Sequence, residues 1–170
     1  FDWFYPVRVL GTAAAIWFFW RSIIPRLHFA SVWSGSAIGI GVAVFVVWMG
    51  LEWAMGNTNT GTAIPNSLEE MPAGFATAWL IFRVLGSVVT VPISEELAFR
   101  GYLLRRLISS DFEKLSPQFT WLSFLLSSFL FGALHGRWLA GTVAGMFYAW
   151  ALYRRGRVAD AIIAHATTNA

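Results

Sequence analysis

The sequence predicts an all-α membrane protein, a multi-spanning bundle of about six helices that encloses a polar cavity. Hydrophobic residues make up 57% of the 170 residues and charged residues only 12%, about half the charged share of a soluble domain. Runs with no charge, or with a single one, recur along the chain, and the longer ones suffice to cross a bilayer as helices. These runs cover residues 9–20, 29–51, 71–94, 115–134 and 138–153.

The helices are expected in the following order. The first covers residues 6–24, the second covers residues 29–54, and the third begins near Pro72. The third helix returns toward Arg105 and Arg106, and its residues 95–110 form a helical hairpin with the fourth helix, residues 118–135, because the polar stretch DFEKLSPQ separates two apolar segments. The last two helices lie on either side of Gly156, which is typical of a helix end.

Charge between the runs predicts the orientation in the membrane. The first loop carries Arg21 and Arg26, whereas the second carries Glu69 and Glu70 with no Lys or Arg. Basic loops stay in the cytoplasm, so the first loop is expected there. Because eleven of the twelve Lys and Arg residues are Arg, mostly in short clusters between apolar runs, the net charge of +3 indicates topology rather than nucleic-acid binding.

The ends of the chain predict a domain within a longer protein. The sequence starts at Phe1 instead of Met, has no signal-peptide pattern, and stops inside an apolar segment. Residues 1–170 are therefore interpreted as one integral-membrane domain. The chain has no cysteine, which excludes disulfides, thiolate nucleophiles and cysteine-bound metals.

Two adjacent carboxylates within an apolar context are the most informative feature. Such groups are costly in membrane helices and usually functional. Arg100 follows Glu96 by four residues and shares its helical face, so these two are expected to form an ion pair, which leaves Glu95 free. The structural alternative is that Ser94 caps a helix whose first turn carries acidic residues.

Three more polar residues follow in apolar segments. His135 comes four residues after Phe131, and His165 and Asn169 share one helical face at i, i+4. In an antiparallel hairpin that turns near residue 115, Glu95 and His135 lie at similar heights, roughly 30 Å from the turn. His165 fits this register less well, because its own turn is near Gly156, and a kink, a tilt or a broken helix is required to bring it near.

The motifs EExxxR (Glu95, Glu96, Arg100), FxxxH (Phe131, His135) and HxxxN (His165, Asn169) together resemble the signature of the CPBP family of intramembrane proteases. That family includes CAAX prenyl endopeptidases and bacterial Abi proteins, and the motif core covers about residues 81–170. A looser resemblance, carried by FYPVRVLGTAAAIWFFWR, VPISEELAFRGYLLRRL and HGRWLAGTVAGMFYAWALYRRGR, points to CAAX prenyl protease-related domains fused to, or encoded beside, a bacterial exosortase.

The resemblance implies a catalytic role for each motif residue. Glu95, assisted by His135, would activate a water molecule, and His165 with Asn169 would stabilise the oxyanion of the tetrahedral intermediate. Glu96, Arg100 and Phe131 would support them. No cofactor is favoured; the alternative is a zinc ion bound by Glu95, His135 and His165.

Two other functions fit the same residues. A non-catalytic scaffold or immunity protein would bind a peptide or partner helix in the cavity, and it would tolerate Glu95→Gln. A transporter would use Arg83 and the carboxylates as a charge relay, although no inverted repeat supports it. Arg83 itself is expected to face the bundle and to pair with a carboxylate or a backbone carbonyl.

The expected partners are the lipid bilayer and a membrane protein or lipid-anchored peptide. The reaction predicted is hydrolysis of a peptide bond in a CAAX-like tail or an envelope sorting signal, and an exosortase in the same chain or operon is a further expected partner.

Overall fold

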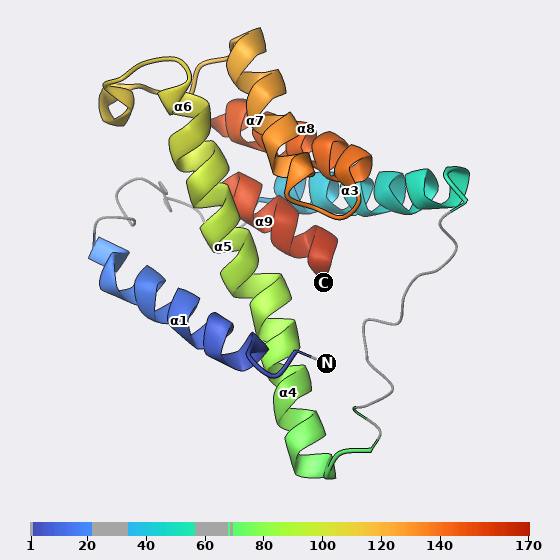
Figure 1. Cartoon of the computed structure of the whole chain (residues 1–170). Coiled ribbons are helices and arrows are strands. Elements are labelled where there is room, and N and C mark those ends of the chain that lie inside the picture. Colours follow the sequence, from blue (N-terminus) through green and yellow to red (C-terminus); the bar gives the residue numbers. More distant parts are fainter. Residues whose placement is uncertain (1, 22–33, 57–67, 69) are drawn as a thin grey trace.

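The computed structural model describes residues 2–21, 34–56, 68 and 70–170, and within these the chain is helical without strands. The predicted all-α bundle of about six helices is confirmed (Figure 1). Its rods are α1 (Tyr5–Phe18), α3 (Gly35–Ala54), a long helix from Ala73 to Arg106, α7 (Trp121–Ala133), α8 (Trp138–Arg155) and α9 (Val158–Asn169).

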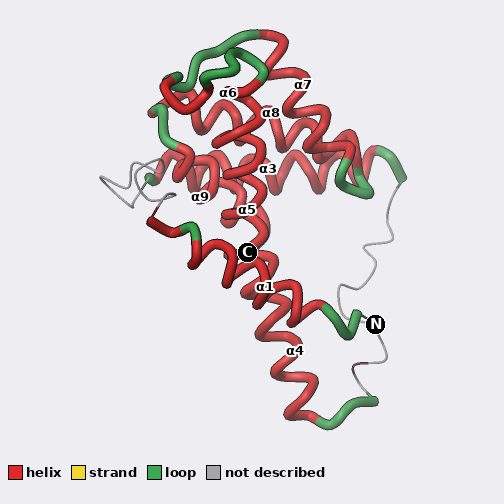
Figure 2. The backbone as a smooth tube through the Cα atoms, turned by 60° about the vertical axis from the view of Figure 1, so that its left-hand side comes forward, coloured by secondary structure: helices red, strands yellow, loops and turns green. Residues whose placement is uncertain are grey.

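The long helix is continuous over 34 residues but not uniform. It consists of α4 (Ala73–Leu85), the π-helical segment η2 (Gly86–Thr90), α5 (Val91–Glu96), the π-helical segment η3 (Leu97–Leu103) and α6 (Leu104–Arg106). Two wide turns therefore flank the short α5 that carries both carboxylates. The α4 end projects beyond the other helices (Figure 2).

The core lies between α3, α7, α8 and α9. One buried cluster joins these helices through Ile40, Val44, Phe131, Ala144, Tyr148, Ala151, Ala161 and Ala164. Helices α7 and α8 approach closely because glycine faces helix backbone: a Cβ built on Gly145 would lie 3.1 Å from the Ser128 Cα atom. Small residues permit this kind of contact in membrane bundles.

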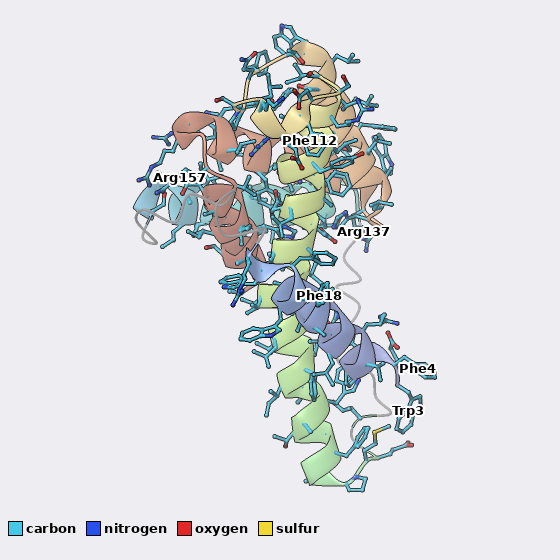
Figure 3. All side chains as sticks on the ribbon, turned by 90° about the vertical axis from the view of Figure 1, so that its left-hand side faces the viewer. Trp3, Phe4, Phe18, Phe112, Arg137 and Arg157 are labelled. Atoms are coloured by element: carbon cyan, nitrogen blue, oxygen red, sulfur yellow. The ribbon has the colours of Figure 1, made fainter. Side chains whose placement is uncertain are left out.

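Helix α1 packs against α4 and η2 and presents apolar side chains outward. Trp17 and Phe18 are 81% and 79% exposed, and Figure 3 shows Phe4 and Phe18 on this outer side. Exposed side chains of this kind suit contact with lipid. In the part of the chain that the structure describes, two helices are long and apolar enough to cross a membrane, Gly35–Ala54 and Ala73–Arg106, while the apolar α7 is shorter.

The described helices differ from the predicted ones mainly at their ends. The first helix ends at Phe18 instead of residue 24, and the predicted 118–135 helix is limited to α7. Most of the two loops that predict the orientation, including Arg26 and Glu69, lies outside the described residues. The later basic residues do gather at one end of the molecule. Arg105 and Lys114 line one surface pocket together with Gly156. Gly156 itself lies in sequence among Arg154, Arg155 and Arg157.

Candidate active site

The predicted pairing of Glu95 with His135 is present. Glu95 Oε2 lies 3.8 Å from His135 Nε2, and the two side chains are 30% and 28% exposed. The Oε2 atom accepts no hydrogen bond from any described residue. Glu95 lies on α5 and His135 in the turn after α7, at matching heights as the hairpin register predicts. This carboxylate is thus the accessible member of the Glu95–Glu96 pair.

Glu96 lies fully buried in a network of charged groups. Arg100 Nη1 donates to Glu96 Oε1 at 3.2 Å, and Arg100 Nε lies 3.2 Å from Glu96 Oε2. The guanidinium also donates to the Gly145 carbonyl at 2.7 Å and lies 4.5 Å from the centre of the Phe131 ring. Both charged side chains have no exposed surface, so the ion pair fixes both groups in place.

His165 joins Glu96, not Glu95. Its Nδ1 atom lies 3.0 Å from Glu96 Oε1, and its ring stacks on Tyr148 with centroids 4.7 Å apart. Helices α8 and α9 form a straight hairpin, since Tyr148 and His165 are nearly equidistant in sequence from Gly156. The tilt that brings His165 near the other motif residues is the angle at which this hairpin crosses the long helix (Figure 1). Helix α9 therefore needs no break of its own.

Asn169 binds the long helix instead of a carboxylate. Its Nδ2 atom donates to the Ser87 carbonyl at 2.9 Å. Ser87 belongs to η2, where the wide π-helical turn alters the regular hydrogen-bond pattern and makes carbonyls available to side chains. Asn169 is thereby held over the helix that carries Glu95.

The motif residues converge on one open pocket of about 530 Å³. Its walls include Phe131, His135, His165 and Asn169, together with Trp48, Tyr148 and Ser87. Glu95 is not among the lining residues and adjoins the pocket through the His135 ring. Aromatic side chains make most of the contacts around the two imidazoles.

Sequence reasoning missed three contributors to this site. Tyr148 stacks on His165, Trp48 packs edge-on against His135 with ring centroids 6.4 Å apart, and Ser87 supplies a carbonyl to Asn169. Counting eight and nine residues outward from Gly156 could have paired Tyr148 with His165. No spacing rule connects Trp48 or Ser87 to the motifs.

The prediction for Arg83 is wrong in part. Arg83 lines the pocket, as expected of a residue that faces the bundle. Its guanidinium, however, lies 4.9 Å from the centre of the Tyr5 ring, and among the described residues it makes no ion pair with a carboxylate. A cation–π contact takes the place of the expected ion pair.

The alternative of a zinc ion bound by Glu95, His135 and His165 stays a prediction. Across the described parts of the chain, no group of three or more His, Asp or Glu side chains is arranged to hold a metal ion. The reason is visible in the site, since His165 is engaged with Glu96 whereas Glu95 and His135 face each other.

Comparison with known proteins supports a family assignment. A family model described as type II CAAX prenyl endopeptidase Rce1-like matches residues 77–170, which is 94 of the 170 residues and includes every motif residue. No curated protein and no solved structure showed a significant match. The family is one of CAAX proteases, which are hydrolases, and the apolar helices agree with a membrane protein.

The expected link to an exosortase is not tested by this match and stays a prediction. The resemblance to CAAX prenyl endopeptidases is confirmed over more than half of the chain. The chain belongs to the Rce1-like family of type II CAAX prenyl endopeptidases.

Proposed function

We propose that the chain is an intramembrane endopeptidase that hydrolyses a peptide bond of a membrane-associated protein with water activated by Glu95 and His135. The observation that supports this most directly is the approach of Glu95 Oε2 to His135 Nε2 at 3.8 Å. Both side chains are partly exposed, and the Oε2 atom that faces His135 is buried without a hydrogen-bond partner among the described residues, so a water molecule between the two groups would satisfy it.

The hydrogen bonds of His135 define which nitrogen can act. Nδ1 lies 2.7 Å from the Phe131 carbonyl, and since a carbonyl only accepts, Nδ1 carries the proton. Nε2 then offers a lone pair toward Glu95. Two acceptors 3.8 Å apart can share one water at about 2.8 Å from each. That water would donate one hydrogen to each group.

Hydrolysis would follow as general-base catalysis. As the water oxygen bonds to the scissile carbonyl carbon, Glu95 takes the proton. When the tetrahedral intermediate collapses and the C–N bond breaks, the same proton passes to the leaving amine. No covalent enzyme intermediate and no cofactor take part.

Asn169 and His165 would stabilise the oxyanion. The amide of Asn169 has two N–H groups, and only one is used on the Ser87 carbonyl. His165 donates from Nδ1 to the Glu96 carboxylate, so it can donate from Nε2 as well only as an imidazolium. Because the Glu96 carboxylate already faces Arg100, the negative charge that balances an imidazolium would be the oxyanion itself.

The substrate proposed is a membrane-anchored protein with a CAAX-like tail or an envelope sorting signal. The family name supports the first and the looser sequence resemblance the second. The pocket of about 530 Å³ is large enough for several side chains. The bacterial inner membrane is the proposed location, by the distribution of arginines.

Quantitative mass spectrometry of membrane-protein termini tests the proposal. Cells with the wild-type protein should produce a new terminus that is lost with Glu95→Gln and kept with Glu70→Gln, a control at an exposed carboxylate outside the site. Repeating the assay with a strong chelator separates the two chemistries, because only a zinc enzyme would lose the product. Identical profiles with folded Glu95→Gln protein would refute the protease and favour a binding module.

A further inference from the structure

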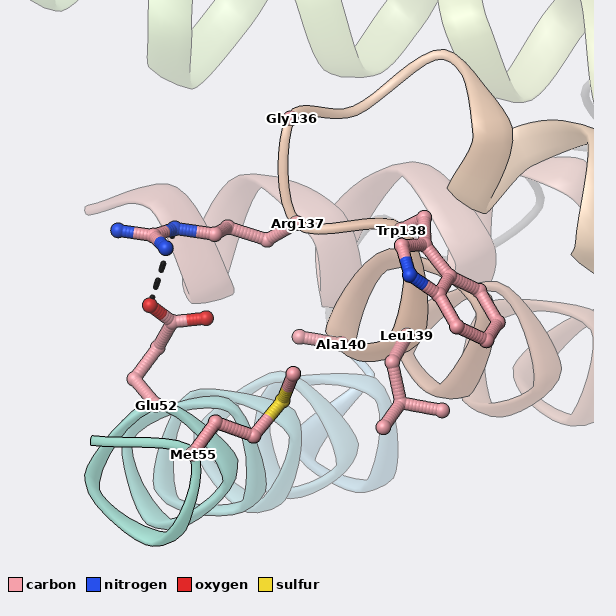
Figure 4. A pocket seen from close by; sticks show the side chains of 7 residues that line it. All are labelled: Glu52, Met55, Gly136, Arg137, Trp138, Leu139 and Ala140. Carbon is pink, nitrogen blue, oxygen red and sulfur yellow. Dashed lines mark ion pairs between the residues drawn. The ribbon is translucent and has the colours of Figure 1, made fainter. Parts of the chain in front are cut away.

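A partly buried ion pair lies next to the candidate active site. Glu52 Oε2 lies 3.0 Å from Arg137 Nε, and the Glu52 side chain is only 12% exposed. Figure 4 shows the pair spanning from α3 to the turn between α7 and α8. Glu52 is the single charged residue of α3, and a lone carboxylate in such a helix is costly without a partner.

The turn held by this ion pair carries His135. His135 and Arg137 are two residues apart in the segment between α7 and α8. Helix α3 contacts that segment at two points one helical turn apart, through Trp48 against the His135 ring and through Glu52 to Arg137. A small cavity of about 70 Å³ beside the ion pair is lined by Glu52, Met55 and residues 136–140 (Figure 4).

We propose that Glu52 and Arg137 are positioning residues that hold the turn so that His135 keeps its Nδ1 proton on the Phe131 carbonyl and its Nε2 lone pair toward Glu95. The backbone holds the turn through few hydrogen bonds. His135 N donates to Gly132 O, and the next helix starts only at Trp138. The role of His135 as a water ligand rests on the proposed function, whereas the ring position does not.

Nitrogen NMR of selectively labelled histidine, in lipid nanodiscs without substrate, measures this directly. The chain has three histidines, so spectra of His28→Gln and His165→Gln assign the signals. In wild type we expect His135 in one tautomer, protonated at Nδ1. Glu52→Gln and Arg137→Gln should each lose that single tautomer and give a mixture, while the His165 signals stay unchanged.

Three further variants keep the test decisive. Arg137→Lys preserves the charge and should keep the wild-type tautomer, and the exchange Glu52→Arg with Arg137→Glu should restore it. Asp111→Asn breaks an exposed ion pair with Lys114 and should have no effect. A folded Glu52→Gln protein with an unchanged His135 spectrum would overturn the proposal, as would an Nε2-protonated His135 in wild type.

These outcomes are independent of peptidase activity. If Glu95→Gln leaves the terminus profile unchanged, the proposed function fails while the effect of Glu52 on the His135 tautomer can still be observed. If the terminus disappears but the tautomer does not respond to Glu52, only the positioning role fails.

Discussion

Glu96 and Arg100 are the residues on which the buried part of the site depends most. Both are fully buried, and Arg100 is the cation that faces Glu96 and also donates to the Gly145 carbonyl. Removing one partner of such a pair leaves an uncompensated charge and costs roughly 3–5 kcal/mol. We therefore expect Arg100→Met to lower the free energy of unfolding by about that amount, measured by denaturant titration in detergent micelles.

The matched control is Lys114→Met, which removes the cation of an exposed pair and should leave stability nearly unchanged. Equal stability of Arg100→Met and wild type would show that the Glu96–Arg100 contact does not support the fold.

Asn169 is a residue whose loss should affect rate more than stability. Its side chain is exposed and makes one hydrogen bond, to the Ser87 carbonyl. An oxyanion donor typically contributes about 10²- to 10³-fold in rate, so Asn169→Ala should slow formation of the product terminus by that factor with little change in unfolding. Ser87→Ala keeps the carbonyl that Asn169 uses and should cleave at a rate near wild type. A rate unchanged by Asn169→Ala would remove this residue from the oxyanion site.

At the contact between α7 and α8, the glycine at position 132 allows the two helix backbones to approach closely. A Cβ on Gly132 would overlap the Thr142 side chain and the backbone of α8, whereas a Cβ on Gly39 of α3 would meet nothing within 4 Å. Gly132→Ala should therefore destabilise the protein by about 1–3 kcal/mol through overpacking. Gly39→Ala should be neutral or stabilising by up to about 1 kcal/mol, because alanine favours the helix. Thermal unfolding of both variants in the same detergent distinguishes the two cases, and equal losses would contradict the packing described.

Neighbouring carboxylates reach different partners because successive side chains of a helix point about 100° apart. Glu95 meets His135 from the α7 side, and Glu96 meets His165 on α9. With η2 before and η3 after it, α5 is offset in rotation relative to the regular helix on either side. The difference in direction lets two adjacent residues of the same type have different surroundings, one accessible and one buried.

Across the whole molecule, the length of the Ala73–Arg106 helix determines which parts reach water. Its 34 residues extend about 50 Å at ~1.5 Å per residue, well beyond a hydrocarbon core of about 30 Å.

Since the chain has no cysteine, Gly74→Cys and Lys114→Cys each introduce a single thiol near opposite ends of this helix. A membrane-impermeant maleimide should label Lys114→Cys only from the cytoplasmic side and Gly74→Cys only from the other side. Labelling of both from one side would refute the orientation.

Sequence patterns predicted the helices well, because apolar runs are a local property. They also predicted that Glu95 and His135 meet, since one short hairpin relates them. Contacts across tilted helices were not accessible in this way. The partner of His165, the cation–π contact of Arg83 and the Glu52–Arg137 pair all depend on crossing angles between helices that are distant in sequence.

The long helix carries two functional parts of the site at once. Glu95, the proposed base, and Ser87, which anchors Asn169, lie eight residues apart on the same rod. Any sliding or rotation of that rod would displace the base from His135 and the anchor from Asn169 in the same movement. A small shift of this one helix would therefore disturb the proposed base and the proposed oxyanion donor together.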